Sequence, residues 1–138
     1  MSLFTKSRKN EVQSFVLKVV NNNCPELKAL IEGPRLGRRV NLTVVVLVIP
    51  VEDGELCPDE AFTAVTKEFS TTGLALVLDG PRPLDEAILG FRWQRDMVFV
   101  RAKAKHLNPM GGGFFQLGFQ ITELTHVGDH PELRALSF

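Results

Sequence analysis

The sequence predicts a mainly β protein: a six-stranded antiparallel β-barrel with a short N-terminal helical segment and a short C-terminal helix. From residue 40 onward, apolar residues alternate with polar ones or fill short β-branched runs, which is the pattern of strands. Turns rather than helices separate these runs at nearly regular spacing, as in barrels and sandwiches. A closed barrel is favoured for a domain of 138 residues, because closure removes unpaired strand edges.

Residues 1–33 are expected to form a tail and a helical segment that precede a barrel domain over residues 34–138. Residues 1–10 are polar and basic and indicate a mobile tail. Residues 11–20 carry apolar side chains at helical spacing, although their β-branched content leaves a strand open as the alternative. Residues 25–31 predict a second helical piece, with proline near its first turn and glycine just past its end.

The pattern after residue 40 predicts six strands joined by short turns. The first expected strand is apolar on both sides in its middle, as a central strand would be. Clusters of Gly, Pro, Asp and Asn mark the turns. The strands are predicted over residues 40–49, 61–69, 74–78, 87–93, 97–106 and 114–122, the turns over 50–58, 70–73, 79–83, 94–96 and 108–113, and the C-terminal helix over 131–136.

Net charge is zero, but charge is unevenly distributed along the chain. Residues 1–40 hold eight Lys or Arg against three Asp or Glu, whereas residues 50–90 hold two against nine. A neutral chain argues against binding to a nucleic acid polymer, which normally needs a broad basic face. A small basic cluster in such a background suits a small anion better.

The sequence contains neither the apolar core of a secretory signal near its start nor a run of roughly 18 apolar residues. We therefore expect a cytoplasmic protein without membrane insertion. Cys24 and Cys57 lack metal-ligand spacing and predict reduced thiols. The three histidines have no such spacing either, so no metal site and no cofactor are predicted.

Arg35, Arg38 and Arg39 place three guanidinium groups within five residues, directly before the first expected strand. Arginine offers a planar fork that can clamp a phosphate, stack on a flat ring or bind a purine edge. Gly37 gives the segment flexibility. A solvated basic turn that precedes a strand is the alternative, and on these residues alone it is at least as good.

A second unusual segment, residues 68–73, interrupts two expected strands with an acid, a hydroxyl and a glycine: Glu68, Ser70 and Gly73. Glycine permits close approach of a ligand to the backbone, and the serine hydroxyl can bind a base edge or a nearby backbone N–H. A plain bulged hairpin is the alternative. Ser70 lacks the surrounding glycines of a nucleophile elbow, so it is not interpreted as catalytic.

Taken together, the two segments resemble the PilZ domain family, the bacterial receptors for cyclic di-GMP. The resemblance rests on R-x-x-x-R before the first strand, on acid-x-S-x-x-G about thirty residues later, and on a return strand containing Phe115-Gln116-Leu117-Gly118-Phe119. It covers roughly residues 34–124. It implies a six-stranded barrel with a helix against one opening and a cyclic dinucleotide site on the barrel's outside.

The resemblance also implies roles for individual residues. Arg35 and Arg39 would contact the phosphates and guanine faces, and Arg38, which lies inside the same motif, could add a further contact. Glu68, Ser70 and Gly73 would hold a guanine edge. The family usually has Asp or Asn where this chain has Glu68, which keeps the acceptor oxygens but adds one methylene. The ligand-binding residues expected are therefore Arg35, Arg38, Arg39, Glu68, Ser70 and Gly73.

The expected function is that of a non-enzymatic cyclic di-GMP receptor that relays ligand binding to a protein partner, or to a second copy of itself, by ordering its arginine loop. A degenerate PilZ-like adaptor that binds no nucleotide and acts by protein contacts is the first alternative. A small barrel enzyme acting on a nucleotide is the second, disfavoured because no acid/base pair or metal set of recognisable spacing is present.

Overall fold

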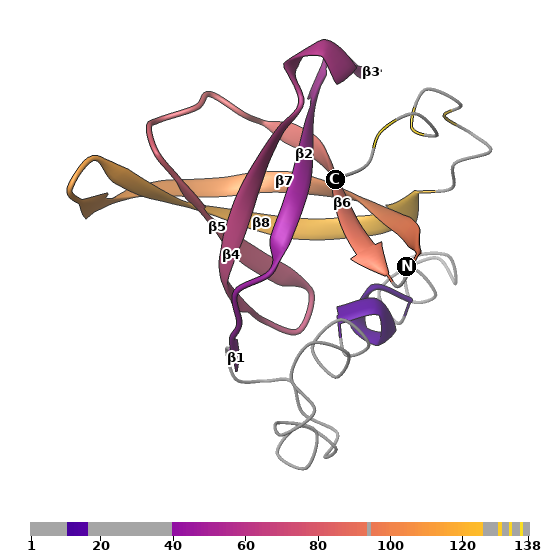
Figure 1. Ribbon diagram of the computed structural model, residues 1–138, viewed down its shortest axis with the longest axis horizontal. Helices are drawn as coiled ribbons and strands as arrows, with labels where there is room; N and C mark the ends of the chain where they lie inside the picture. Colours follow the sequence, from indigo (N-terminus) through magenta and orange to yellow (C-terminus); the bar gives the residue numbers. More distant parts are fainter. Residues whose placement is uncertain are drawn as a thin grey trace, which may run out of the picture.

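The computed structural model describes residues 11–16, 40–93, 95–125, 130, 133 and 136. In this part of the chain one antiparallel sheet closes on itself (Figure 1). The strands β4, β5, β8, β7, β6 and β2 follow one another around a six-stranded barrel, which confirms the predicted architecture. Their bounds are β2 Val45–Glu52, β4 Phe62–Phe69, β5 Gly73–Leu78, β6 Glu86–Trp93, β7 Asp96–Gly111 and β8 Phe114–Thr125.

Two strands of two residues extend the sheet. β1 (Val40–Asn41) lies beside β4, and β3 (Glu55–Leu56) lies beside β2. Closure comes from β2, which pairs with β6 over six residues and with β4 over four. The prediction of a central first strand is confirmed for β2, because it has a hydrogen-bonded neighbour on each side.

Alternate side chains of the strands fill the barrel, as the period of two requires. Phe69, Leu76 and Leu89 are fully buried in this interior. The helical segment at residues 11–16 adds three apolar side chains to the same cluster. One of them, Phe15, meets Phe91 edge to face, with ring centroids 5.2 Å apart, which is a favourable aromatic geometry. The described part of the N-terminal segment is therefore helical and packs against the barrel.

A second apolar cluster lies outside the barrel, over β2, β6 and β7. Leu47, Ile49, Ile88 and Phe99 form it together with Leu133. Ile49 and Ile88 have no exposed surface although they point away from the barrel interior. The apolar character of β2 on both faces thus has a physical cause, since one face lines the barrel and the other packs with Leu133 and Leu136.

The prediction of a continuous strand over residues 40–49 is wrong at its N-terminal part. Residues 42–44 separate β1 from β2 and have no strand geometry. The side chain of Thr66, 1% exposed, fills this gap. Its Oγ1 donates to the backbone oxygen of Leu42 over 2.6 Å and accepts from the backbone N–H of Val44 over 2.8 Å. Two backbone hydrogen bonds still join these residues to β4, from Leu42 N–H to the Lys67 oxygen and from Thr66 N–H to the Val44 oxygen. The buried hydroxyl bridges the irregular stretch between them.

Two predicted turns are shorter than expected because strands run through prolines. β2 continues through Pro50, which pairs with Ala87, and ends at a tight turn where Asp53 and Gly54 have positive φ. A short 3-10 helix, η2 (Pro58–Glu60), follows β3. β7 likewise continues through Pro109 to Gly111, so that only residues 112–113 form the hairpin tip.

The predicted helix at residues 25–31 lies outside the described residues, as does most of the predicted helix at 131–136. In the latter range, Leu133 and Leu136 are described, and each donates a backbone hydrogen bond to the residue three before it. A C-terminal helix is not shown. No helix within the described ranges is both long and apolar enough to span a bilayer.

Candidate functional site

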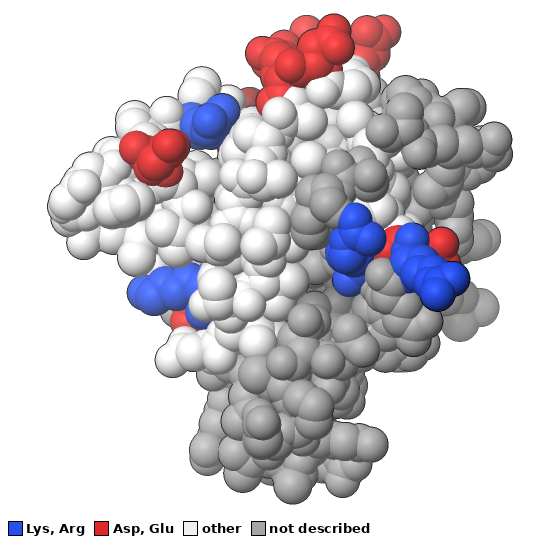
Figure 2. Space-filling model, in the orientation of Figure 1, with Lys and Arg blue, Asp and Glu red and all other residues white. Residues whose placement is uncertain are grey.

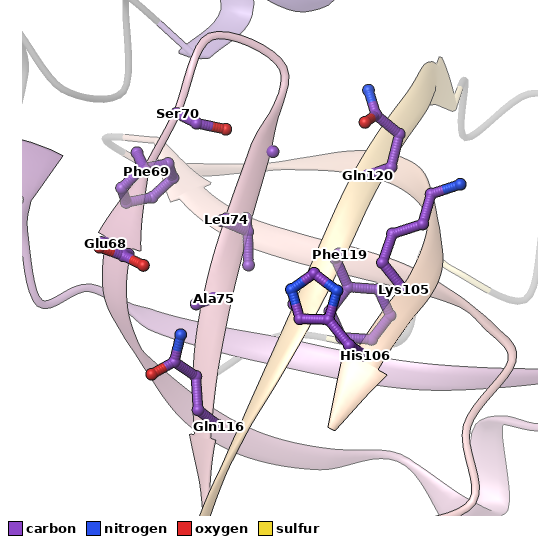
Figure 3. Close-up of a pocket in the computed structure, with 12 residues that line it drawn as sticks. Glu68, Phe69, Ser70, Leu74, Ala75, Lys105, His106, Gln116, Phe119 and Gln120 are labelled. Carbon is purple, nitrogen blue, oxygen red and sulfur yellow. The ribbon is translucent and has the colours of Figure 1, made fainter. Parts of the chain in front are cut away.

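A pocket of about 170 Å³ lies on the outer wall of the barrel, at the end of β4 and across β5, β8 and β7 (Figure 3). Four neighbouring elements of the sheet therefore contribute to one hollow. Its lining consists of Glu68, Phe69, Ser70, Gly73, Leu74, Ala75, Lys105, His106, Gln116, Gly118, Phe119 and Gln120.

The turn at residues 70–73 forms one end of the pocket. The backbone N–H of Ser70 donates to the oxygen of Gly73 over 2.9 Å and closes the hairpin between β4 and β5. Gly73 pairs with Gln120 of β8, and the strands approach so closely that a Cβ on Gly73 would lie 2.6 Å from the backbone oxygen of Phe119. A glycine is required here by close packing of two backbones.

The outward side of β8 forms the floor. Gln116, Gly118 and Gln120 alternate with inward-facing aromatic and leucine side chains. Gly118 pairs with His106 of β7, and the imidazole lies directly above it, with Nε2 3.1 Å from where a Cβ would stand. The missing side chain therefore makes room for a flat ring against the strand.

Hydrogen bonds hold the 70–73 turn onto β8. Gln120 Nε2 donates to Thr72 Oγ1 over 2.8 Å, and the N–H of Ile121 donates to the backbone oxygen of Thr72 over 2.9 Å. At the other end of the floor, Lys67 Nζ donates to Gln116 Oε1 over 3.1 Å. These bonds anchor the turn and one side chain of the floor on the sheet.

The structure brings three predicted site residues together: Glu68, Ser70 and Gly73 all line the pocket. The three predicted arginines, Arg35, Arg38 and Arg39, lie outside the described residues. What the structure does place is the chain immediately after them. Val40 pairs with Phe69 and Asn41 pairs with Glu68, so the arginine segment joins the barrel beside the second motif.

Acidic side chains gather elsewhere, at the end of the molecule that carries β3 (Figure 2). Glu52, Asp53 and Glu55 are exposed there, which accounts for part of the negative charge of residues 50–90. The pocket instead has one acid, Glu68, and one amine, Lys105, in its lining.

The acidic end also holds the one group of possible metal ligands among the described residues. The ligand atoms of Glu52, Cys57 and Glu60 lie within 4.8 Å of one another. Partial desolvation and the neighbouring carboxylate of Glu52 raise the pKa of the Cys57 thiol. Exposed acidic groups commonly gather in this way without an ion, so the cluster by itself does not indicate a metal centre.

Four polar residues of the lining were not predicted from the sequence: Lys105, His106, Gln116 and Gln120. They come from β7 and β8, which are remote in sequence from residues 68–73 and reach the pocket only through the strand order β5-β8-β7. One signal was available, because a glycine inside a strand, here Gly118, often marks a close approach of another group.

Comparison with known proteins gives no family model that matches the chain and no matching curated protein. Among solved structures, the chain is similar to the Bacillus subtilis inhibitor of motility MotI/DgrA, with a TM-score of 0.48 and 18% identity over 69% of this chain and 45% of that one. It is also similar to MrkH, described as a c-di-GMP-dependent transcription regulatory factor, with a TM-score of 0.42 and 15% identity over 70% of this chain and 46% of that one. The chain thus spans less than half the length of either protein.

Proposed function

We propose that this chain is a PilZ-type receptor for cyclic di-GMP and that the ligand binds in the pocket beside the 70–73 turn. One observation carries the proposal: β1 pairs with the end of β4. This pairing joins the chain that follows Arg39 to the strand that carries Glu68. The two motifs are separated by about thirty residues in sequence, yet the barrel brings their attachment points into hydrogen-bonding contact.

Chain geometry allows the arginines to reach this pocket. Consecutive Cα atoms are about 3.8 Å apart, so Arg39 is one such step from Val40, which pairs with Phe69 of the pocket lining. Arg35 is five residues from Val40, within about 18 Å of extended chain. Both guanidinium groups can therefore be brought over a ligand that sits on β5 and β8.

The chemistry of the lining suits a guanine nucleotide. The Glu68 carboxylate can accept from guanine N1–H and N2–H, and the Ser70 hydroxyl can bond a base edge. The arginines can pair with phosphates and stack on a purine. Lys105 adds a second kind of cation at the rim, and His106 offers a flat ring beside the floor. The proposed role is non-enzymatic, with ligand binding ordering the arginine segment and thereby altering a protein contact.

Calorimetric titration with cyclic di-GMP, with GTP as the control ligand, tests this proposal. We expect saturable binding that is weakened about 10- to 100-fold by Arg35→Ala or Arg39→Ala, since a charged hydrogen bond contributes about 1.5–3 kcal/mol. Arg95→Ala is the matched control, because Arg95 is exposed in the turn between β6 and β7 and outside the pocket lining. Equal loss in all three variants would contradict the proposal.

The alternative is an adaptor that has lost the nucleotide, and Glu68 is the residue that favours it. The extra methylene of Glu relative to Asp moves the carboxylate by about one C–C bond length. A hydrogen bond tolerates a much smaller displacement of its donor and acceptor. Substituting Glu68→Asp separates the two functions. A rise in affinity identifies a weakened receptor, whereas no binding by either form at high micromolar ligand supports the adaptor.

A further inference from the structure

A β-bulge in β7 turns His106 toward the pocket. Ala104 pairs with Phe119 and His106 pairs with Gly118, so Lys105 is the extra residue of the bulge. The side chain of Ala104 packs against the barrel core. In a regular strand, residues two apart share a face, and His106 would then face the core as well. With the extra residue it faces outward and lines the pocket, and bulges commonly redirect a side chain in this way next to a functional site.

His106 ends a row of paired residues that begins at Glu68 and crosses the outer wall of the barrel. Glu68 of β4 pairs with Ala75 of β5. Ala75 pairs with Gly118 of β8, which in turn pairs with His106 of β7. Paired residues of neighbouring strands project from the same face, and the strands are about 4.8 Å apart. The carboxylate and the imidazole therefore belong to opposite ends of a row about 14 Å long, and Figure 3 shows them on either side of Ala75.

The imidazole of His106 is seated on Gly118. The three heavy atoms nearest to a Cβ built on Gly118 all belong to this ring, namely Nε2 at 3.1 Å, Cδ2 at 3.3 Å and Cε1 at 3.6 Å. One side of the ring thus lies against the strand. Because His106 is exposed, a ligand can reach the other side. A planar, exposed and supported ring is the kind of surface on which nucleic acid bases stack.

We propose that His106 is the stacking platform for one guanine of the ligand and that Gly118 is its positioning residue. The inference rests on the proposed function and names a contact outside the two sequence motifs. A guanine that directs its N1–H and N2–H toward Glu68 extends over Ala75, whose small side chain leaves room for the ring system. The far part of the base then overlaps the imidazole at the other end of the row.

Calorimetric titration with cyclic di-GMP of two His106 variants tests the stacking role. His106→Phe keeps a flat ring and should leave the dissociation constant within about threefold of the unmodified chain, because stacking needs only a π face. His106→Gln keeps a polar side chain but loses the ring, and should weaken binding about tenfold. Asn108→Ala is the control, since Asn108 is exposed on the same strand but lies outside the pocket lining. An unchanged thermal midpoint checks the fold of each variant.

Gly118→Ala tests the positioning role. The new Cβ must move the imidazole by 3.4 − 3.1, about 0.3 Å, to restore an ordinary contact. Its nearest atoms belong to a side chain that can rotate, so the change acts on the ring rather than on the backbone. We expect binding to weaken about two- to fivefold, and to weaken no further when Gly118→Ala is added to His106→Gln. An equal loss in both backgrounds would mean that the methyl group obstructs the ligand directly, and would overturn the role of Gly118.

A spectroscopic measurement reports on the stack itself. The imidazole Cε1–H resonance of His106, identified by its absence in His106→Gln, should move upfield on addition of cyclic di-GMP, because it comes to lie over a purine face. Binding that needs Arg35 and Arg39 but is unaffected by His106→Gln, or that leaves this resonance in place, overturns the inference and leaves the proposed function standing. Equal losses in His106→Phe and His106→Gln overturn stacking in favour of a hydrogen bond. No binding by the unmodified chain overturns both.

Discussion

Replacing Gly73 by alanine tests the close approach of β5 to β8 at the pocket. The added Cβ would lie 2.6 Å from the Phe119 backbone oxygen and 3.2 Å from Ser70 Oγ. Ordinary contacts of a Cβ begin at 3.4 Å, so the strands must separate by 3.4 − 2.6, about 0.8 Å. Overpacking of this kind costs about 1–3 kcal/mol. Part of it is offset by about 0.4–1 kcal/mol, because alanine restricts the unfolded chain. A net loss of about 1–2 kcal/mol is expected.

Gly80→Ala is the control for this prediction. No heavy atom lies within 4 Å of the Cβ position there and its φ is not in the left-handed region, so only the unfolded-state effect applies and stability should stay equal or rise slightly. Urea unfolding of both variants, compared at equal m-value, measures the difference. If Gly73→Ala is as stable as Gly80→Ala, the strands are not in the tight contact described and the turn does not require glycine.

Three further changes test other parts of the structure. Thr66→Val removes the hydroxyl that joins two backbone groups and should cost about 1–3 kcal/mol of unfolding free energy in urea, whereas Thr63→Val on the exposed side of the same strand should cost little. Phe15→Ala removes a ring that is 6% exposed and should lower stability by about 3–5 kcal/mol; a loss below about 1 kcal/mol would mean that the helical segment does not pack as described. In a variant whose other cysteine is replaced by serine, Cys57 should alkylate slowly with iodoacetamide at neutral pH, because its raised pKa lowers the thiolate fraction. Glu52→Gln should lower that pKa and accelerate the reaction, and an unchanged rate would show that this carboxylate does not act on the thiol.

The barrel was predictable because its strands alternate or run apolar between clear turn signals. Two of the errors occur at prolines. Pro50 and Pro109 were taken to end strands, since proline cannot donate to a ladder. In the structure Pro50 pairs with Ala87 on a strand that has neighbours on both sides. Pro109 lies near the tip of the β7–β8 hairpin, where β7 has a neighbour on one side only. A sequence does not say which side of a strand is open, so it cannot tell where a proline is tolerated.

The pocket was predictable only in part, for a related reason. Glu68, Ser70 and Gly73 are close in sequence, so a local motif was enough to place them together. Lys105 and His106 reach the same hollow through strand order and through a register shift between Ala104 and His106. A bulge of this kind changes which side chains face outward, and the local sequence pattern does not predict it.

The hydroxyl bridge made by Thr66 has a mechanical consequence. It fixes residues 42–44 to β4 just after the point where the arginine segment enters the barrel. Because residues 42–44 are held on β4, a movement of the chain before residue 40 is not transmitted to β2. If the proposed ligand orders the arginine segment, the change would therefore reach the helical segment, whose residues 12, 15 and 16 pack against the barrel, and would leave the six strands in place.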